Sequence, residues 1–161
     1  MQRERIEHPI SPFFTENSRI LILGSFPSVK TRESGFFYGH PQNRFWKVIA
    51  AVFEEAVPVT VPEKKAFLTR NHIALWDVIQ SCDIIGSSDA SIQNVIANDL
   101  SDILSHAPVE RIIVNGRTAE RFYQKYTENR ILRAAICLPS TSPANAAWKL
   151  EDLIEEWKII R

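Results

Sequence analysis

The sequence predicts an α/β fold with a mostly parallel sheet of about four strands and helices on both faces. First, apolar runs of strand length alternate along the chain with segments of helical periodicity. Second, these runs are almost continuously apolar, as expected of strands buried on both sides. Third, each run ends in polar residues or a turn, so the polar ends should share one edge of the sheet.

The elements follow in order from local patterns. Residues 1–18 lack a regular pattern and predict an irregular arm with a turn at Ser11-Pro12. The strands are predicted from short apolar runs, and the helices from apolar side chains that recur at i, i+3, i+4 and i+7. The expected strands are 19–24, 73–78, 111–114 and 134–138, and the expected helices are 42–53, 63–71, one or two within 91–107 with Asn98 or Asp99 as a cap, 118–126 and 146–159.

The composition is that of a soluble globular protein, with 45% apolar and 24% charged residues among 161. This length suits a single domain over residues 1–161. No apolar stretch reaches the roughly 18 residues of a membrane span. The charged N-terminus also lacks the apolar run of a secretory signal. We therefore expect a cytoplasmic protein that does not contact membranes and acts as a monomer.

The two cysteines, Cys82 and Cys137, are too few for a cysteine-only metal or iron–sulfur site and are not in a CxxC arrangement. We expect both to be reduced thiols, and we expect neither a metal nor a cofactor. A net charge of zero argues against a protein that coats nucleic acid by bulk electrostatics. It leaves room for a local basic patch.

Residues 21–46 are the most informative stretch. An apolar strand run ends in a turn, and a loop rich in glycine and aromatic residues leads into a helix. Loops at the carboxyl ends of parallel strands commonly form ligand sites. This loop mixes aromatic rings with cations, a combination that binds single-stranded or flipped-out bases. The alternative is an ordinary solvated loop.

Three motifs occur in order along the chain: GSFPS at 24–28, GFFYGHPQNRFWKV at 35–48 and LPSTSPANAAW at 138–148. Together they resemble the uracil-DNA glycosylase superfamily over about residues 19–157. The loop and the helix that follows it resemble the mismatch-specific glycosylases. The GSFPS, HPQNRFW and STSPAN forms are most similar to the hypoxanthine branch, the DNA-deoxyinosine glycosylases.

The resemblance implies a three-layer α/β/α sandwich and a monofunctional enzyme that hydrolyses the N-glycosidic bond of a damaged base without a metal. The implied partner is DNA that contains a deaminated base, and hypoxanthine in deoxyinosine is the implied substrate. Alternatives are a mismatch-type uracil-DNA glycosylase and a non-catalytic DNA-binding member of the fold. The first motif lacks the Asp or Asn of better-known branches, so another residue must position the water.

Two residues are candidates for catalysis. The Asn43 amide can accept a hydrogen bond from water and donate elsewhere, although Asn is also a favoured helix cap. Asp77 ends the 73–78 run, where the uracil branch carries a base-reading Asn. An ionised Asp77 accepts hydrogen bonds only, so it could read the N1–H of hypoxanthine or act on water, or it could cap a turn.

Three further residues are candidates for binding the base. Tyr38 aligns with the aromatic residue that stacks on the base in the mismatch-specific relatives, and otherwise packs its loop. Phe26 could form a second apolar wall or belong to the core. Asn115 leaves a central strand towards the same edge and could contact base or sugar, but Asn before Gly is also common in turns.

The candidates for DNA contacts lie in the motif loops. The resemblance implies that the last motif contacts phosphates near the vacated base, which suits hydroxyl groups and backbone N–H groups at the start of a helix. The same residues are ordinary caps and turns elsewhere. His40 could contact phosphate or the leaving base, or could brace its loop. The set comprises Ser28, His40, Arg44, Ser140, Thr141, Ser142 and Asn145.

Overall fold

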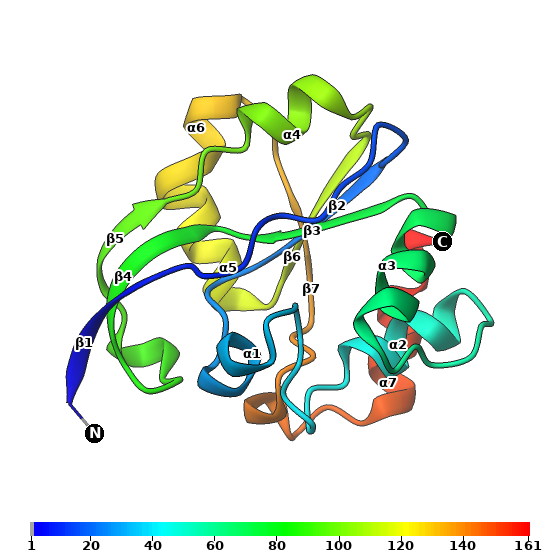
Figure 1. Ribbon diagram of the computed structural model, residues 1–161, viewed down its shortest axis with the longest axis horizontal. Helices are drawn as coiled ribbons and strands as arrows, with labels where there is room; N and C mark the ends of the chain where they lie inside the picture. Colours follow the sequence, from blue (N-terminus) through cyan, green and yellow to red (C-terminus); the bar gives the residue numbers. More distant parts are fainter. Residues whose placement is uncertain (1) are drawn as a thin grey trace.

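The computed structural model describes residues 2–161, and within this range the strands form two sheets (Figure 1). The larger sheet is parallel, has four strands in the order β3-β2-β6-β7, and confirms the predicted sheet. Its apolar strands form because their alternate side chains are buried on opposite faces. The bounds are β2 Ile20–Gly24, β3 Ile73–Asp77, β6 Arg111–Asn115 and β7 Ile136–Leu138.

Helices cover both faces of this sheet, as expected for a three-layer α/β/α sandwich. Ile20 and Ile22 of β2 face one hydrophobic cluster, and Leu21 and Leu23 face another. The first cluster includes side chains of α2 (Phe45–Val52), α3 (Val61–Arg70) and α7 (Leu150–Trp157). The second includes side chains of α4 (Ser101–His106) and α5 (Arg117–Phe122), beyond which the chain continues through a π-helical turn (Tyr123–Thr127) into α6 (Glu128–Ile131).

The predicted irregular arm is wrong for its first part, because β1 (Arg3–Glu7) is a strand. Its residues pair antiparallel with β4 (Ile79–Ile85), and β4 pairs with β5 (Gln93–Ala97) to complete a three-stranded sheet within residues 2–161. Figure 1 shows β1 beside β4. The sequence of an exposed segment such as β1 gives little local indication of a strand, because its backbone hydrogen bonds are made with a strand that is distant in sequence.

The predicted helix over 91–107 is wrong for its first half and correct only for α4. Ile92, Val95 and Ile96 have helical spacing, but β-branched side chains also favour a strand when a neighbouring strand offers pairing. Short helical segments that the sequence did not indicate also occur: α1 (Val29–Ser34) and the 3₁₀ turns Asp89–Ser91 and Pro143–Asn145. The predicted last helix ends in a 3₁₀ turn at Lys158–Ile160.

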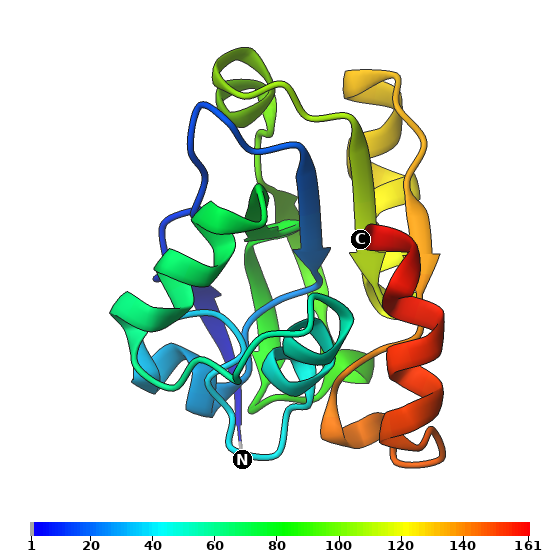
Figure 2. The same cartoon turned by 90° about the vertical axis from the view of Figure 1, so that its right-hand side faces the viewer.

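The parallel strands end at one edge of the sheet, as predicted. Figure 2 shows the arrowheads of β2, β6 and β7 pointing the same way. The residues at these ends are Gly24, Asp77, Asn115 and Leu138. None of the helices in the described range is long and apolar enough to span a membrane.

Candidate active site

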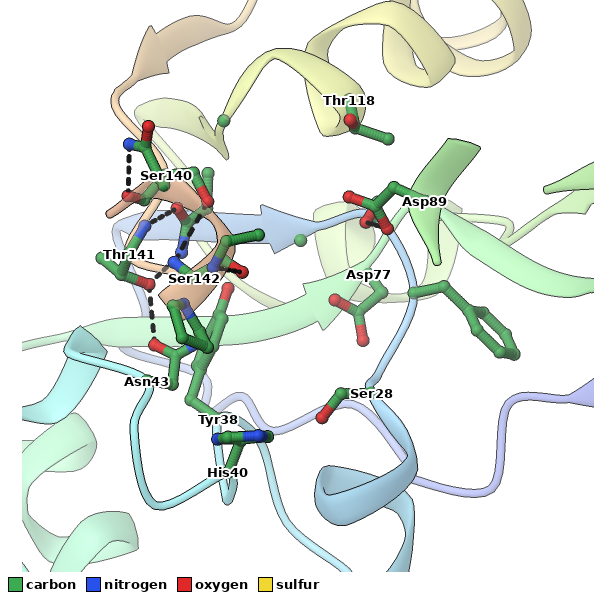
Figure 3. A pocket seen from close by; sticks show the side chains of 18 of the residues that line it. Ser28, Tyr38, His40, Asn43, Asp77, Asp89, Thr118, Ser140, Thr141 and Ser142 are labelled. Carbon is green, nitrogen blue, oxygen red and sulfur yellow. Dashed lines mark hydrogen bonds between the residues drawn. The ribbon is translucent and has the colours of Figure 1, made fainter. Parts of the chain in front are cut away.

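A cavity of about 880 Å³ lies at the carboxyl edge of the parallel sheet (Figure 3). Its walls come from the end of β3, from the loops after β2, β6 and β7, from the loop before α2 and from residues 87–89. Every candidate residue except Arg44 lines it, so the structure brings together residues that are far apart in sequence. These residues are Phe26, Ser28, Tyr38, His40, Asn43, Asp77, Asn115, Ser140, Thr141, Ser142 and Asn145.

Asp77 lies deep in this cavity, with a side chain that is only 7% exposed. Its Oδ2 lies 2.7 Å from Nε2 of His8, and its backbone carbonyl accepts a hydrogen bond of 2.8 Å from the Asn98 amide. Its Oδ1 faces the paired strand, where a Cβ on Gly24 would come within 2.4 Å of it. Position 24 must therefore be glycine for the carboxylate to occupy this place.

Tyr38 reaches the same point from the loop before α2. Its backbone is in the left-handed region, with φ of 54°, and its ring stacks on Phe45 with centroids 4.0 Å apart. Within residues 2–161 its buried hydroxyl has no hydrogen-bond partner. Burial raises the pKa of Tyr38 well above its ordinary value, and the charge of Asp77 adds to this effect. The phenol therefore remains a neutral donor at physiological pH.

Thr141 joins three segments through hydrogen bonds. Both amide atoms of Asn115 bind it: Nδ2 donates to Thr141 Oγ1 at 3.0 Å, and Oδ1 accepts from the Thr141 backbone N–H at 3.1 Å. The Thr141 hydroxyl then donates to Asn43 Oδ1 at 2.9 Å, as Figure 3 shows. Thr141 is fully buried. It offers no surface to a phosphate and instead positions the last motif.

Asn43 has one polar group engaged and one free. Its Oδ1 also accepts from the backbone N–H of Phe45 at 2.9 Å, which caps the start of α2. Two hydrogen bonds use both lone pairs of an amide oxygen. The Asn43 NH₂ group donates no hydrogen bond in the described part of the chain, so the group left for chemistry in the cavity is a donor.

Arg44 lies beside the cavity rather than in it. Its guanidinium donates to the backbone carbonyls of Asn145, at 3.1 Å, and Trp148. Its backbone N–H donates to the Thr141 carbonyl at 3.1 Å. These contacts hold the 140–148 loop against α2, so the predicted cation serves to position the loop.

The remaining candidates lie at the rim of the cavity, except for Phe26. Ser28 caps α1, and Ser142 caps the 3₁₀ turn that follows it. His40 accepts from the Gln42 N–H through Nδ1, at 3.1 Å. Phe26 is buried and its ring meets His8 edge-on, with centroids 5.9 Å apart. Asn145 donates to the Ser140 carbonyl at 2.9 Å.

Sequence reasoning missed two titratable residues of the site. His8 comes from the arm, where no motif marked it. Asp89 lies on the 87–89 loop, and Ser25 Oγ approaches its carboxylate at 3.5 Å (Figure 3). Partial removal from water raises the pKa of Asp89, and the charge of Asp77 raises it further. Within residues 2–161, no three His, Cys, Asp or Glu side chains are grouped to hold a metal.

Three comparisons with known proteins each find relatives of this chain. Residues 11–160 match the model of the Uracil DNA glycosylase superfamily. A hypoxanthine DNA glycosylase of Methanosarcina acetivorans is 33% identical over 147 residues, which cover 90% of this chain and 91% of that protein. A hypoxanthine DNA glycosylase of Methanosarcina barkeri is 31% identical over 113 residues, which cover 69% of this chain and 72% of that protein.

Among solved structures, the chain resembles a solution NMR structure of a candidate uracil DNA glycosylase from Methanosarcina acetivorans. The TM-score is 0.79 at 28% identity, and the match covers 96% of this chain and 98% of the other.

Asp89→Asn is expected to raise the free energy of unfolding at neutral pH. A carboxyl group whose pKa rises on folding opposes folding once it ionises. The gain should therefore be present at neutral pH and vanish below the ordinary pKa of 3.8. Urea unfolding of both proteins near neutral pH and in acid measures it.

Asp99→Asn is the matched control. The Ser101 backbone N–H lowers the pKa of the Asp99 carboxyl, so this substitution should reduce stability at neutral pH. If both variants shift the free energy of unfolding in the same direction, the raised pKa assigned to the Asp89 carboxyl is wrong.

Proposed function

Since the chain belongs to the uracil DNA glycosylase superfamily, we propose that this DNA glycosylase removes hypoxanthine from deoxyinosine in DNA. The observation that carries the proposal is the buried Asp77 carboxylate of the cavity: His8 holds Oδ2, and among residues 2–161 no donor is bound to Oδ1. The names of the two similar Methanosarcina proteins support the same substrate.

The size of the cavity suits this substrate. A volume of about 880 Å³ falls within the range of sites that enclose a small molecule, and it can hold a purine with its sugar. A base in a duplex must first leave the stack, which costs a few kcal/mol. A deaminated base pairs poorly with its partner strand and therefore costs less to extrude.

Hydrogen bonding at Asp77 would select the base. Hypoxanthine carries a proton on N1, which can be donated to Asp77 Oδ1. Adenine has a bare N1 acceptor there, so its lone pair would face the carboxylate, and a buried acceptor without a donor is costly. Uracil carries a ring N–H as well, so Asp77 would reject adenine more strongly than uracil.

The reaction requires water to replace the base at the sugar carbon. The C1′–N9 bond breaks and its electron pair leaves with the base, while the water oxygen bonds to C1′. The proton lost by the water is balanced by protonation of the departing base, so the products are free hypoxanthine and an abasic sugar. In an oxocarbenium-like transition state the carbon is already strongly electrophilic, so the water needs positioning more than deprotonation. We assign this positioning to the free NH₂ group of Asn43, which can donate to the water oxygen.

The rim would hold the DNA strand. Ser140, Ser142 and Asn145 are partly exposed at the cavity mouth, as are Ser28 and His40. Hydroxyl and imidazole groups of this kind bind phosphate oxygens without reading sequence. Thr141 and Arg44 would act indirectly, because their hydrogen bonds keep the 140–148 loop in place.

An excision assay tests the proposal. Purified protein with EDTA is incubated with single-stranded and duplex oligonucleotides that contain one deoxyinosine or one deoxyuridine, and alkali then cleaves any abasic site. We expect cleavage at inosine. Cleavage at uracil alone would make uracil, rather than hypoxanthine, the substrate. DNA binding without cleavage at either base would indicate a non-catalytic member of the family.

Asn43→Ala is expected to bind DNA and to lose most excision, by about a hundredfold, because the donor that positions the water is removed. Asn43→Asp is the matched variant, since it keeps an oxygen for the Phe45 N–H and the Thr141 hydroxyl but lacks the NH₂ group. Single-turnover rates and melting temperatures are measured together. Excision at the native rate in both variants would refute the role of Asn43.

Asp77→Asn is expected to retain the fold, because an amide oxygen can still accept from His8. Its NH₂ group would then replace the free acceptor that faces the base. Inosine excision should fall by about tenfold to a hundredfold, as for other hydrogen bonds to a charged group. Inhibition by free hypoxanthine should weaken in parallel, whereas inhibition by free adenine should not. Unchanged inhibition by both bases would remove Asp77 as the reader.

A further inference from the structure

We propose that His8, from the N-terminal arm, is a positioning residue of this site. It holds one oxygen of the Asp77 carboxylate and thereby keeps the other oxygen turned to the base. The inference rests on the proposed function for its catalytic consequence. Its structural part stands on the contacts of the arm alone.

The contact is short and shielded from water. His8 Nε2 lies 2.7 Å from Asp77 Oδ2, and the side chains are 2% and 7% exposed. A hydrogen bond to a carboxylate in such surroundings is stronger than the same bond in water. It therefore determines the orientation of the carboxylate.

The hydrogen bond at Nδ1 of His8 shows which of its two ring nitrogens carries the proton. The backbone N–H of Ile10 donates to His8 Nδ1 at 3.1 Å, so Nδ1 carries no proton. A neutral imidazole then has its proton on Nε2, where it is donated to Asp77. The rings of Phe26 and Phe37 pack against the imidazole, with centroids at 5.9 and 6.2 Å, and hinder its rotation.

The arm is anchored on both sides of His8. Before it, β1 pairs with β4 from Arg3 opposite Ile85 to Glu7 opposite Ser81, and the His8 N–H donates to the Gln80 carbonyl at 2.7 Å. After it, Phe13 forms a β-bridge with Leu75 of β3. The intervening segment therefore crosses the end of β3 in a fixed path, with His8 over Asp77.

Three constraints then act on Asp77 together. Strand pairing with Gly24 places its backbone, the Asn98 amide holds its carbonyl, and His8 holds Oδ2. Only Oδ1 remains to accept a hydrogen bond from the base. Without His8 the Asp77 carboxylate could rotate about its last torsion angle. Its Oδ1 would then no longer be oriented to accept a hydrogen bond before the base binds.

Nitrogen NMR of the histidine side chains tests the geometry without any substrate. In ¹⁵N-labelled protein near neutral pH, the His8 ring should show a protonated Nε2 and an unprotonated Nδ1, with a slowly exchanging Nε2 proton. The His8 signals are assigned by their loss in His8→Gln. The Nε2 proton should exchange rapidly in Asp77→Ala. A proton on Nδ1, or no change in Asp77→Ala, would overturn the proposal.

Two variants test the catalytic consequence. His8→Phe keeps an aromatic ring but removes the donor, and its inosine excision should fall by about tenfold to a hundredfold while DNA affinity stays within about twofold. His8→Gln can donate to Asp77 through its amide and should recover part of the rate. His106→Phe, at the exposed end of α4, is the matched control and should behave as the native protein.

The outcomes separate the two proposals. Native excision by a folded His8→Phe would overturn the role of His8. Failure of His8→Phe to fold would leave the decision to the NMR experiment and to His8→Gln. If the native protein excises neither inosine nor uracil, the proposed function fails, and the NMR result still decides whether His8 holds Asp77.

Discussion

Parallel pairing of β2 with β3 on one side and with β6 on the other is the constraint on which the site depends. It places Gly24 opposite Asp77 and brings Asn115 to the same edge. Because the strands are buried on both faces, a shift in register would bury polar ends and expose apolar ones. The absence of a side chain at Gly24 is what allows the Asp77 carboxylate to lie against the neighbouring strand.

A partly buried polar chain then connects the edge of the sheet to the two motif loops. It runs from the Asn115 amide through the Thr141 hydroxyl, which is fully buried, to the Asn43 oxygen. Hydrogen bonds shielded from water in this way are costly to break. The motif residues thus act largely on each other, and in the proposed function the Asn43 NH₂ group and the rim hydroxyls remain for chemistry and DNA.

The distribution of charge fits a site that takes in a base and leaves phosphates outside. Asp77 and Asp89 both line the cavity, so its interior disfavours anions; partial removal from water is the main cause of the raised pKa of Asp89, and the charge of Asp77 adds to it. In the proposed function, neutral purines with a ring N–H would be favoured there, whereas hydroxyl groups lie at the mouth. His8 completes this arrangement because it donates to Asp77 without adding a charge.

The sequence by itself determined the parallel sheet, most of its helices and the residues that meet at its edge, because continuous apolar runs and polar strand ends are local patterns. Only the tertiary structure decided that residues 3–7 and 93–97 are strands, since their backbone hydrogen bonds come from partners far along the chain. It also decided that Thr141 and Arg44 position a loop, and that His8 touches Asp77 across 69 positions of sequence. Such contacts depend on how distant segments pack, and no local pattern of residues encodes them.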